Sequence, residues 1–138
     1  MANEILLVNN LPLVLVTGAT GAVGPSVIEA LHQAGHSIRT LSIDEPQAGS
    51  LPPGIEARIG DVTDELGVQS AMQGVEAVVH LAALLHITNP PPTLRQRYKK
   101  VNIGGTSTVV KAALEIRSGE DEKLGRYENE RRYKDDAN

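Results

Sequence analysis

The sequence predicts an α/β fold, a doubly wound parallel sheet with helices on both of its faces. Short apolar runs alternate with segments of helical spacing in the order strand, helix, strand, strand, helix, strand, helix. The first apolar run leads directly into a series of glycines and then into a helix. Right-handed crossovers between parallel strands would complete this arrangement.

The composition limits the class of protein. The chain has 138 residues, which is one domain's worth, and its core must be aliphatic because Phe and Trp are absent. A net charge of −4 with scattered Lys and Arg argues against a nucleic-acid partner, and the lack of Cys excludes disulfides and thiolate metal sites. Without a long apolar run or a signal peptide, we expect no membrane partner and a cytoplasmic location.

The first strand, Leu13 to Val16, ends in a turn that is suited to a diphosphate. After it, Gly18 lets the chain turn sharply, Gly21 lets the backbone approach a pyrophosphate, and Gly24 lets the next helix pack closely on the strand. The first amides of that helix have no intrahelical acceptor and would point at the anion. The alternative is that all three are ordinary turn glycines.

The first helix is expected from Ala22 to Ala34. Pro25 lies in its first turn, where a missing amide hydrogen is tolerated, and Gly35 should end it. Its apolar face is predicted from residues at helical spacing, namely Val23, Val27, Ala30, Leu31 and Ala34.

The second strand, Ser37 to Ile43, is followed by Asp44. An acidic side chain at this position can accept hydrogen bonds from the adenosine ribose and select NAD. The alternative is a turn-forming Asp before a proline-containing loop. Both interpretations remain open.

The third strand, Ile55 to Ile59, is followed by Asp61, at the edge where open parallel sheets bind ligands. The alternative for Asp61 is a structural loop residue. Thr63 or Asp64 is expected to cap the short helix that follows.

The fourth strand, Val75 to Leu81, is almost continuously apolar, which predicts a central strand that is buried on both faces. Small residues then follow and would let a flat ring or a ribose approach. His80, at its end, is interpreted as a hydrogen-bonded strand histidine in preference to a site residue.

A long helix is expected from about Leu94 to Arg117. Gly104 and Gly105 lie inside it, and close packing against the sheet would offset their low helix propensity. The side chain of Asn102 has two possible roles: it points toward the site, or it only tethers backbone groups by hydrogen bonds. One face of this helix is predicted to pack on the sheet through Tyr98, Val101, Gly105, Val109, Ala112 and Ile116.

Four motifs in order give the chain a family resemblance. They are TGATGAVG at 17–24, GDVTD at 60–64, VVHLAA at 78–83 and VNIGGTSTVVKAA at 101–113. From Leu13 to Ile116 the chain resembles the extended short-chain dehydrogenase/reductases, in particular the NAD-dependent epimerase/dehydratase group. This resemblance implies a Rossmann-like fold and NAD or NADP as cofactor.

The resemblance also implies roles for single residues. Thr17, Gly18, Gly21 and Gly24 would form the pyrophosphate loop, with Ala22 and Val23 beside it. Asp61 and Val62 would hold the adenine, Leu81, Ala82 and Ala83 would line the ribose side, and Asn102 would support the active site. The acidic residue that closes the second strand in NAD-using relatives aligns with Ser42 more naturally than with Asp44.

The chain departs from the family after the long helix. Relatives continue into a further strand and a catalytic Tyr-x-x-x-Lys, a spacing that does not occur in this sequence. We expect residues 1–12 to be an extension, 13–117 to be the partial nucleotide-binding domain, and the charged residues 118–138 to be a disordered tail of a truncated or frameshifted relative. The fourth strand would then expose an edge open to self-association.

Three functions follow from these expectations. The first is an oxidoreductase or epimerase acting by hydride transfer on a nucleotide-sugar or sterol-like alcohol, with its catalytic half missing. The second is a non-catalytic dinucleotide-binding module or redox sensor. The third is an inactive truncated fragment.

Overall fold

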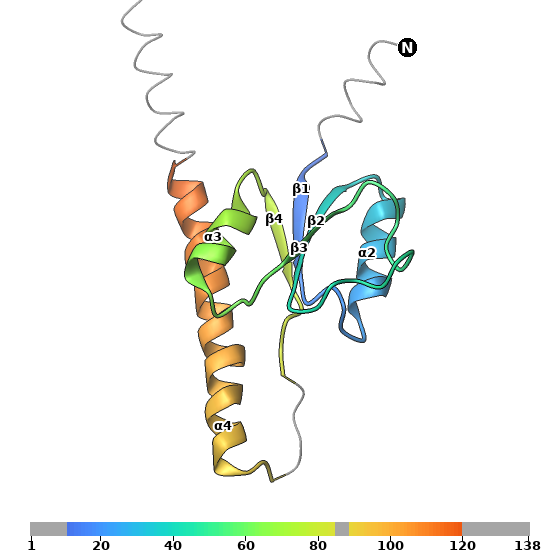
Figure 1. Cartoon of the computed structure of the whole chain (residues 1–138). Helices are drawn as coiled ribbons and strands as arrows, with labels where there is room; N and C mark the ends of the chain where they lie inside the picture. Colours follow the sequence, from blue (N-terminus) through green and yellow to red (C-terminus); the bar gives the residue numbers. More distant parts are fainter. Residues whose placement is uncertain (1–10, 85–88, 120–138) are drawn as a thin grey trace, which may run out of the picture.

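A computed structural model describes residues 11–84 and 89–119 of the chain. Four parallel strands form one sheet, with one helix on one face and two helices on the other (Figure 1). The predicted extension and tail lie almost entirely outside the described residues. The elements are β1 (Leu13–Thr17), α2 (Gly24–Gln33), β2 (Ser37–Ser42), β3 (Glu56–Ile59), α3 (Glu65–Met72), β4 (Ala77–His80), α4 (Pro92–Tyr98) and the π-helical η1 (Lys99–Gly105).

The sheet has the strand order β3-β2-β1-β4, and every neighbouring pair is parallel. Leu15 of β1 is in register with Arg39 on one side and Val78 on the other. The predicted doubly wound parallel sheet is therefore confirmed. β1 lies inside the sheet, and the carboxyl ends of β1, β2 and β4 meet at one edge.

Alternate residues of β1 supply two separate cores. Leu15 packs in a cluster with α3 and the long helix that runs from 92 to 119, whereas Val14 and Val16 pack with Ile28 of α2. All four of these residues are nearly inaccessible to solvent. Because side chains alternate across a strand, a single apolar run can fill both sides of the sheet.

Helix α2 begins and ends close to where the sequence predicts. Pro25 is in its first turn, and Gly35 follows it with φ of +87°. The buried face is rotated from the predicted one, however, since Ile28 is completely buried while Ala30 and Ala34 are exposed.

The expectation that the fourth strand is central and buried on both faces is wrong for the described chain. β4 pairs only with β1, and Ala77 is exposed while Val78, Val79 and His80 are half-buried. A strand is buried on both faces only where other elements cover both faces, and its apolar composition alone does not show whether they do.

The long helix consists of α4, η1 and an α-helical stretch over 106–119. Its predicted face packs inward, with Gly105, Val109 and Ala112 buried. A Cβ at Gly105 would lie 2.7 Å from Cγ2 of Val62, so close packing explains this glycine. Gly104 has more space, since the nearest atom to such a Cβ is 3.9 Å away.

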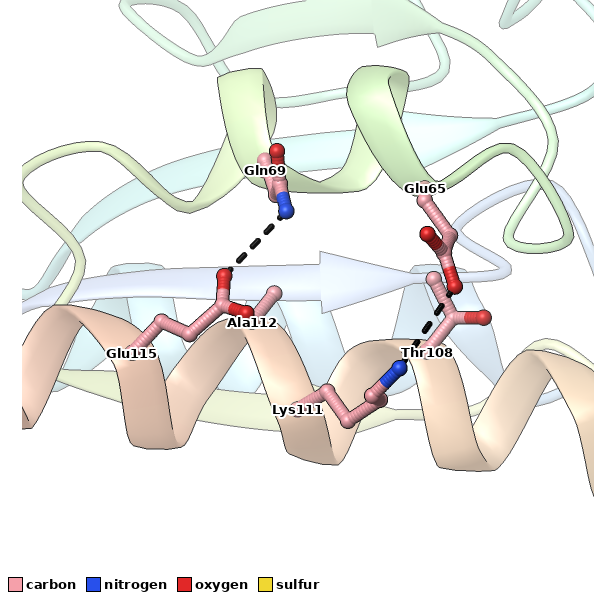
Figure 2. Close-up of a pocket in the computed structure, with 6 residues that line it drawn as sticks. All are labelled: Glu65, Gln69, Thr108, Lys111, Ala112 and Glu115. Atoms are coloured by element: carbon pink, nitrogen blue, oxygen red, sulfur yellow. Dashed lines mark hydrogen bonds and ion pairs between the residues drawn. The ribbon is translucent and has the colours of Figure 1, made fainter.

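Helix α3 lies against the long helix and is tied to it by polar side chains (Figure 2). Gln69 donates to Glu115 over 3.2 Å, and Lys111 is 3.7 Å from Glu65. The hollow between them measures only about 20 Å³, which is room for about one water molecule. We interpret these contacts as helix packing and not as a ligand site.

Two arginines hold the carboxyl end of α3. Nη1 of Arg39 donates to the carbonyls of Ala71 and Gln73 over 2.7 and 2.6 Å, and Arg58 donates to residue 70. Both arginines also hydrogen-bond Glu56, which lowers the pKa of that carboxyl. At its other end, α3 has Asp64 at the N-cap position, but neither this side chain nor another makes the expected capping hydrogen bond.

Candidate functional site

The candidate ligand site is a cleft at the carboxyl edge of the sheet. It encloses about 180 Å³ and lies between the turn after β1, the end of β2 and the segment after β4. Parallel sheets bind ligands at this edge. The residues that line it are Gly18, Thr20, Gly21, Leu41, Ser42, Ile43, Asp44, Gly60, Val62, Leu81, Ala82, Ala83, Leu84 and Val101.

The shape of this cleft requires a glycine at position 18. It has φ of +71°, a conformation that favours glycine, and its amide donates to the carbonyl of Leu41 over 2.9 Å. A Cβ here would lie 2.6 Å from the backbone nitrogen of Ala82. Gly18 therefore does more than allow a turn, because it lets the segment after β4 approach the turn after β1.

The other two glycines shape the start of α2. The amide of Gly21 donates to the carbonyl of Gly18 over 3.0 Å, which closes the turn. A Cβ on Gly24 would collide with the carbonyl of Ala19, so the helix starts in contact with the loop that precedes it. The closest packing at Gly24 is therefore against Ala19 in this loop, and not against the strand as predicted.

The amino end of α2 is open to an anion. Val23 occupies the N-cap position, no side chain caps the helix, and its first turn contains no acidic residue. The first amides of a helix carry no intrahelical acceptor and form the positive end of its dipole. An uncapped helix end next to a glycine turn is a favourable place for a phosphate.

Thr17 lies beneath the cleft and does not line it. Its side chain is completely buried, and its Oγ1 accepts from the amides of Leu81 and Ala82 at 3.2 and 3.3 Å. Oγ1 is also 2.6 Å from Nδ1 of His80. Thr17 therefore joins the end of β1 to the end of β4.

His80 is hydrogen-bonded at both ring nitrogens, as the interpretation as a strand histidine predicts. Besides Thr17, it contacts Oγ1 of Thr106 on the long helix through Nε2 at 3.1 Å. Burial lowers the pKa of His80, because the charged ring would lose hydration.

Asn102 tethers backbone. Its amide accepts from the nitrogen of Leu84 over 2.8 Å and donates to the carbonyl of the same residue over 3.1 Å. Of the two roles considered for Asn102, this is the one that its contacts fit. The π-helical turn of η1 carries this side chain.

The acidic candidates differ in position. Asp44 lies exposed at the rim of the cleft, and its carbonyl accepts from the hydroxyl of the buried Ser42 over 3.0 Å. The carboxylate of Asp61 accepts from the amide of Thr63 over 2.9 Å, which fits the structural alternative, and it does not line the cleft.

The structure thus brings seven predicted site residues into one cleft, namely Gly18, Gly21, Asp44, Val62, Leu81, Ala82 and Ala83. Thr17, Ala22, Val23, Gly24 and Asp61 do not line it. The lining residues that sequence reasoning missed lie in the turn after β1, at the end of β2, directly after β2, β3 and β4, and in the long helix, namely Thr20, Leu41, Ser42, Ile43, Gly60, Leu84 and Val101. The rule that ligands bind at the carboxyl ends of parallel strands, applied to every strand, would have found Leu41, Ser42, Ile43 and Gly60.

Residues 11–84 and 89–119 contain neither a metal site nor a membrane span. Within these ranges, no cluster of His, Asp and Glu could hold a metal ion. No helix in the same part of the chain has the length and apolarity needed to cross a bilayer.

Comparisons with known proteins support the resemblance drawn from the motifs. Residues 15–117 match the model of the 3-beta hydroxysteroid dehydrogenase/isomerase family. Among individual relatives, the chain is 32% identical over 109 residues to a 3 beta-hydroxysteroid dehydrogenase/Delta 5→4-isomerase of Mycobacterium tuberculosis. It is 38% identical over 102 residues to an L-arabinose 1-dehydrogenase (NAD(P)(+)) of Haloferax volcanii.

The matched region is a part of each relative. The two alignments cover 77% and 73% of this chain but 29% and 35% of the relatives. A solved short-chain dehydrogenase/reductase superfamily protein from Agrobacterium tumefaciens, with bound NAD, is similar at a TM-score of 0.62 and 33% identity. That likeness covers 73% of this chain and 28% of the solved one.

The sequence match and the structural likeness fall on the same elements. The family match begins within β1 and ends within the long helix, so it contains the cleft, the glycine turn and the segment after β4. The predicted Rossmann-like fold and the predicted superfamily are both confirmed. The chain belongs to the 3-beta hydroxysteroid dehydrogenase/isomerase family of short-chain dehydrogenase/reductase proteins.

Proposed function

We propose that this chain binds NAD(P), with the diphosphate at the amino end of α2 and the adenosine in the cleft beside β2. The observation that carries the proposal is the uncapped helix end next to Gly18 and Gly21, at the carboxyl edge of a parallel sheet. Thr17, Gly24, Ala22 and Val23 support this loop from below or beside it. Val62 and the 81–84 segment supply the walls.

We further propose that the cleft prefers NAD to NADP. Asp44 lines it, and the stretch from 42 to 55 contains Asp44 and Glu45 but no Lys or Arg. A 2′-phosphate placed there would meet two carboxylates and no cation, whereas a ribose hydroxyl could donate to Asp44. Ser42, which aligns with the usual acidic position, donates its hydroxyl hydrogen to the turn that carries Asp44.

Calorimetric titration of the chain with NAD and with NADP tests both proposals. NAD should bind more tightly than NADP. The Asp44→Asn variant should show a smaller difference between the two affinities. Gly18→Val should abolish binding of both, because its side chain would fill the turn. Unchanged affinity in Gly18→Val would remove the proposed site.

The activity that the family membership suggests is hydride transfer to NAD(P) from a sterol or sugar alcohol, as the names of the relatives indicate. A bound nicotinamide supplies the hydride acceptor in this chemistry. The residues of this chain hold and orient the cofactor, and the Tyr and Lys of the family's dyad would have to come from elsewhere. A Tyr-x-x-x-Lys in the coding DNA downstream of codon 117, in any frame, would support this proposal.

A non-catalytic dinucleotide-binding module is the second candidate. It is favoured because binding of a dinucleotide needs only the cleft and the uncapped start of α2. NAD binding without turnover of steroid or sugar alcohols would support it. Failure to bind either nucleotide would favour the third expectation, an inactive fragment.

Self-association through β4 is a further part of the proposal. β4 pairs with β1 alone among the described strands, and beside it lies a hollow lined by Val75, Ala77, Val78 and Ile116. An unpaired strand edge can accept a strand from a second chain. Analytical ultracentrifugation should show a concentration-dependent dimer.

We also propose a cytoplasmic location, which fractionation of cells would test.

A further inference from the structure

We propose that His80 is a positioning residue of the cofactor cleft. As the neutral tautomer with its proton on Nε2, it fixes the 81–84 segment against Gly18, and protonation of the ring weakens cofactor binding. The second half of this inference rests on the proposed NAD(P) function, whereas the first half does not.

The contacts at Thr17 determine one ring nitrogen. A hydroxyl has one hydrogen to donate and two lone pairs to accept with. Thr17 Oγ1 accepts from the amide of Ala82 and shares the amide of Leu81 with the backbone carbonyl of Thr17, which lies 3.1 Å from that nitrogen. Because both amides approach Oγ1 as donors, its own hydrogen is best directed at Nδ1 of His80 over 2.6 Å, which makes Nδ1 an unprotonated acceptor.

The contacts at Thr106 determine the other nitrogen independently. The hydroxyl of Thr106 donates to the backbone carbonyl of Asn102 over 2.7 Å. Its hydrogen is therefore used, and the contact of 3.1 Å to Nε2 of His80 requires a hydrogen on the ring. The two ends of the imidazole thus specify the same neutral tautomer.

A second proton on the ring would be poorly accommodated. Nδ1–H would face the hydroxyl of Thr17, on which the amides of Leu81 and Ala82 already converge, and the hydroxyl hydrogen would lose Nδ1 as its acceptor. The bond that joins the end of β1 to His80 would be lost. A buried donor that loses its acceptor costs free energy, so we expect the segment after β4 to move.

No charge on the surrounding elements favours the protonated ring. The turn after β1 (13–24), the strand and segment around His80 (77–84) and the facing part of the long helix (102–110) contain no ionisable residue besides His80 itself. The carboxylates that follow β2 and β3 at this edge of the sheet, those of Asp44, Glu45, Asp61 and Asp64, are all exposed. Burial is the cause of the lowered pKa of His80.

The network reaches the cleft directly. Leu81 and Ala82, whose amides Thr17 holds, are lining residues, and the nitrogen of Ala82 would touch a Cβ on Gly18. Movement of this segment would therefore change the wall opposite the glycine turn. His80 itself does not line the cleft, and it acts through Thr17.

The sign of the pH effect follows from the tautomer. Binding needs the neutral ring, so affinity is complete above the pKa of His80 and falls as the pH drops through it. If the protonated form does not bind, the apparent Kd rises about tenfold for each pH unit below that pKa.

Two measurements test the inference. Long-range nitrogen–proton NMR spectra of the labelled chain without cofactor should show His80 as the Nε2–H tautomer at pH 7, and it should titrate below the ordinary histidine pKa of about 6.5. Calorimetric titration with NAD between pH 5 and 8 should show weaker binding on the acid side. In His80→Asn, whose amide oxygen can still accept from Thr17, that acid limb should be missing.

The outcomes separate this inference from the proposed function. An Nδ1–H tautomer, or a ring that is charged at pH 7, would overturn the positioning role whether or not NAD binds. An acid limb that persists in His80→Asn would overturn the link to affinity. Absence of NAD binding at every pH would refute the proposed function and this link together, while the tautomer would still decide the positioning role.

Discussion

Replacing Gly18 by alanine is the sharpest test of the geometry of the cleft. The new Cβ would meet backbone atoms of Leu81 and Ala82 at 2.6 to 2.8 Å, and backbone cannot rotate away as a flexible side chain can. The residue would also have to keep φ of +71°. Gly18→Ala therefore combines backbone strain with a collision across the cleft.

The backbone strain and the collision each have an expected cost. A non-glycine residue at positive φ costs about 1–2 kcal/mol, and overpacking against a fixed neighbour costs about 1–3 kcal/mol. Gly18→Ala should thus lower the free energy of unfolding by about 2–5 kcal/mol. If about 1.4 kcal/mol of the collision is relieved by displacing the 81–84 segment, NAD affinity falls about tenfold.

Gly74→Ala is the matched control. Gly74 has φ of +74°, close to that of Gly18, but a Cβ added there would have no neighbouring atom within 4 Å. It follows α3 at the opposite edge of the sheet from the cleft. Gly74→Ala should therefore cost only the strain, about 1–2 kcal/mol, and leave NAD affinity unchanged.

Urea unfolding and NAD titration of the two variants give the answer. The reasoning requires a larger loss of stability in Gly18→Ala than in Gly74→Ala, together with a loss of affinity in Gly18→Ala alone. Equal losses of stability with unchanged affinity in both would show that the segment after β4 does not bear on Gly18 as described.

Four further predictions concern groups outside the glycine turn. Thr40→Val should raise stability by about 1 kcal/mol in urea unfolding, because Oγ1 of Thr40 is buried without a hydrogen-bond partner. Arg39→Met should destabilise by about 2–3 kcal/mol through loss of charged hydrogen bonds to α3, and the same change at the more exposed Arg58 should cost less than about 1 kcal/mol. Asn102→Leu should weaken NAD binding and lower the melting temperature, because it leaves backbone groups after β4 unpaired; an unchanged Kd would contradict the tether. Because burial lowers the pKa of His80, the unfolded chain binds a proton that the folded chain does not, so its contribution to stability is complete above about pH 6.5 and declines below it. Thermal unfolding of the wild type and of His80→Asn across this pH range measures the difference.

Most of the fold could be predicted from the sequence, because it depends on local features of the chain. The strand, turn and helix around Gly18 and the stop at Gly35 were predictable because a positive φ and a helix end leave a signature in single residues. The inward face of the long helix was predictable for a similar reason, since its apolar residues recur at helical spacing.

Features that depend on distant parts of the chain were not predictable. The buried face of α2 includes Ile28 because of where β1 and β2 lie, and helical spacing alone is also compatible with a rotated face. The apolar composition of β4 predicted a central strand, and only the lack of a further apolar run after the long helix indicated that β4 would be an edge strand of the described sheet. The hydrogen bond from Thr17 to His80 spans 63 positions of sequence, and no local pattern encodes it.

The position of β1 between two cores has a consequence for motion. β1 is hydrogen-bonded on both edges and buried on both faces, so its amides should be among the last in the domain to exchange with deuterium. The glycine turn is attached to the end of this slowest-opening strand. Fraying of β3 or β4 can thus leave the strand that carries the glycine turn intact, and the turn would keep its shape during partial openings that already release the outer strands.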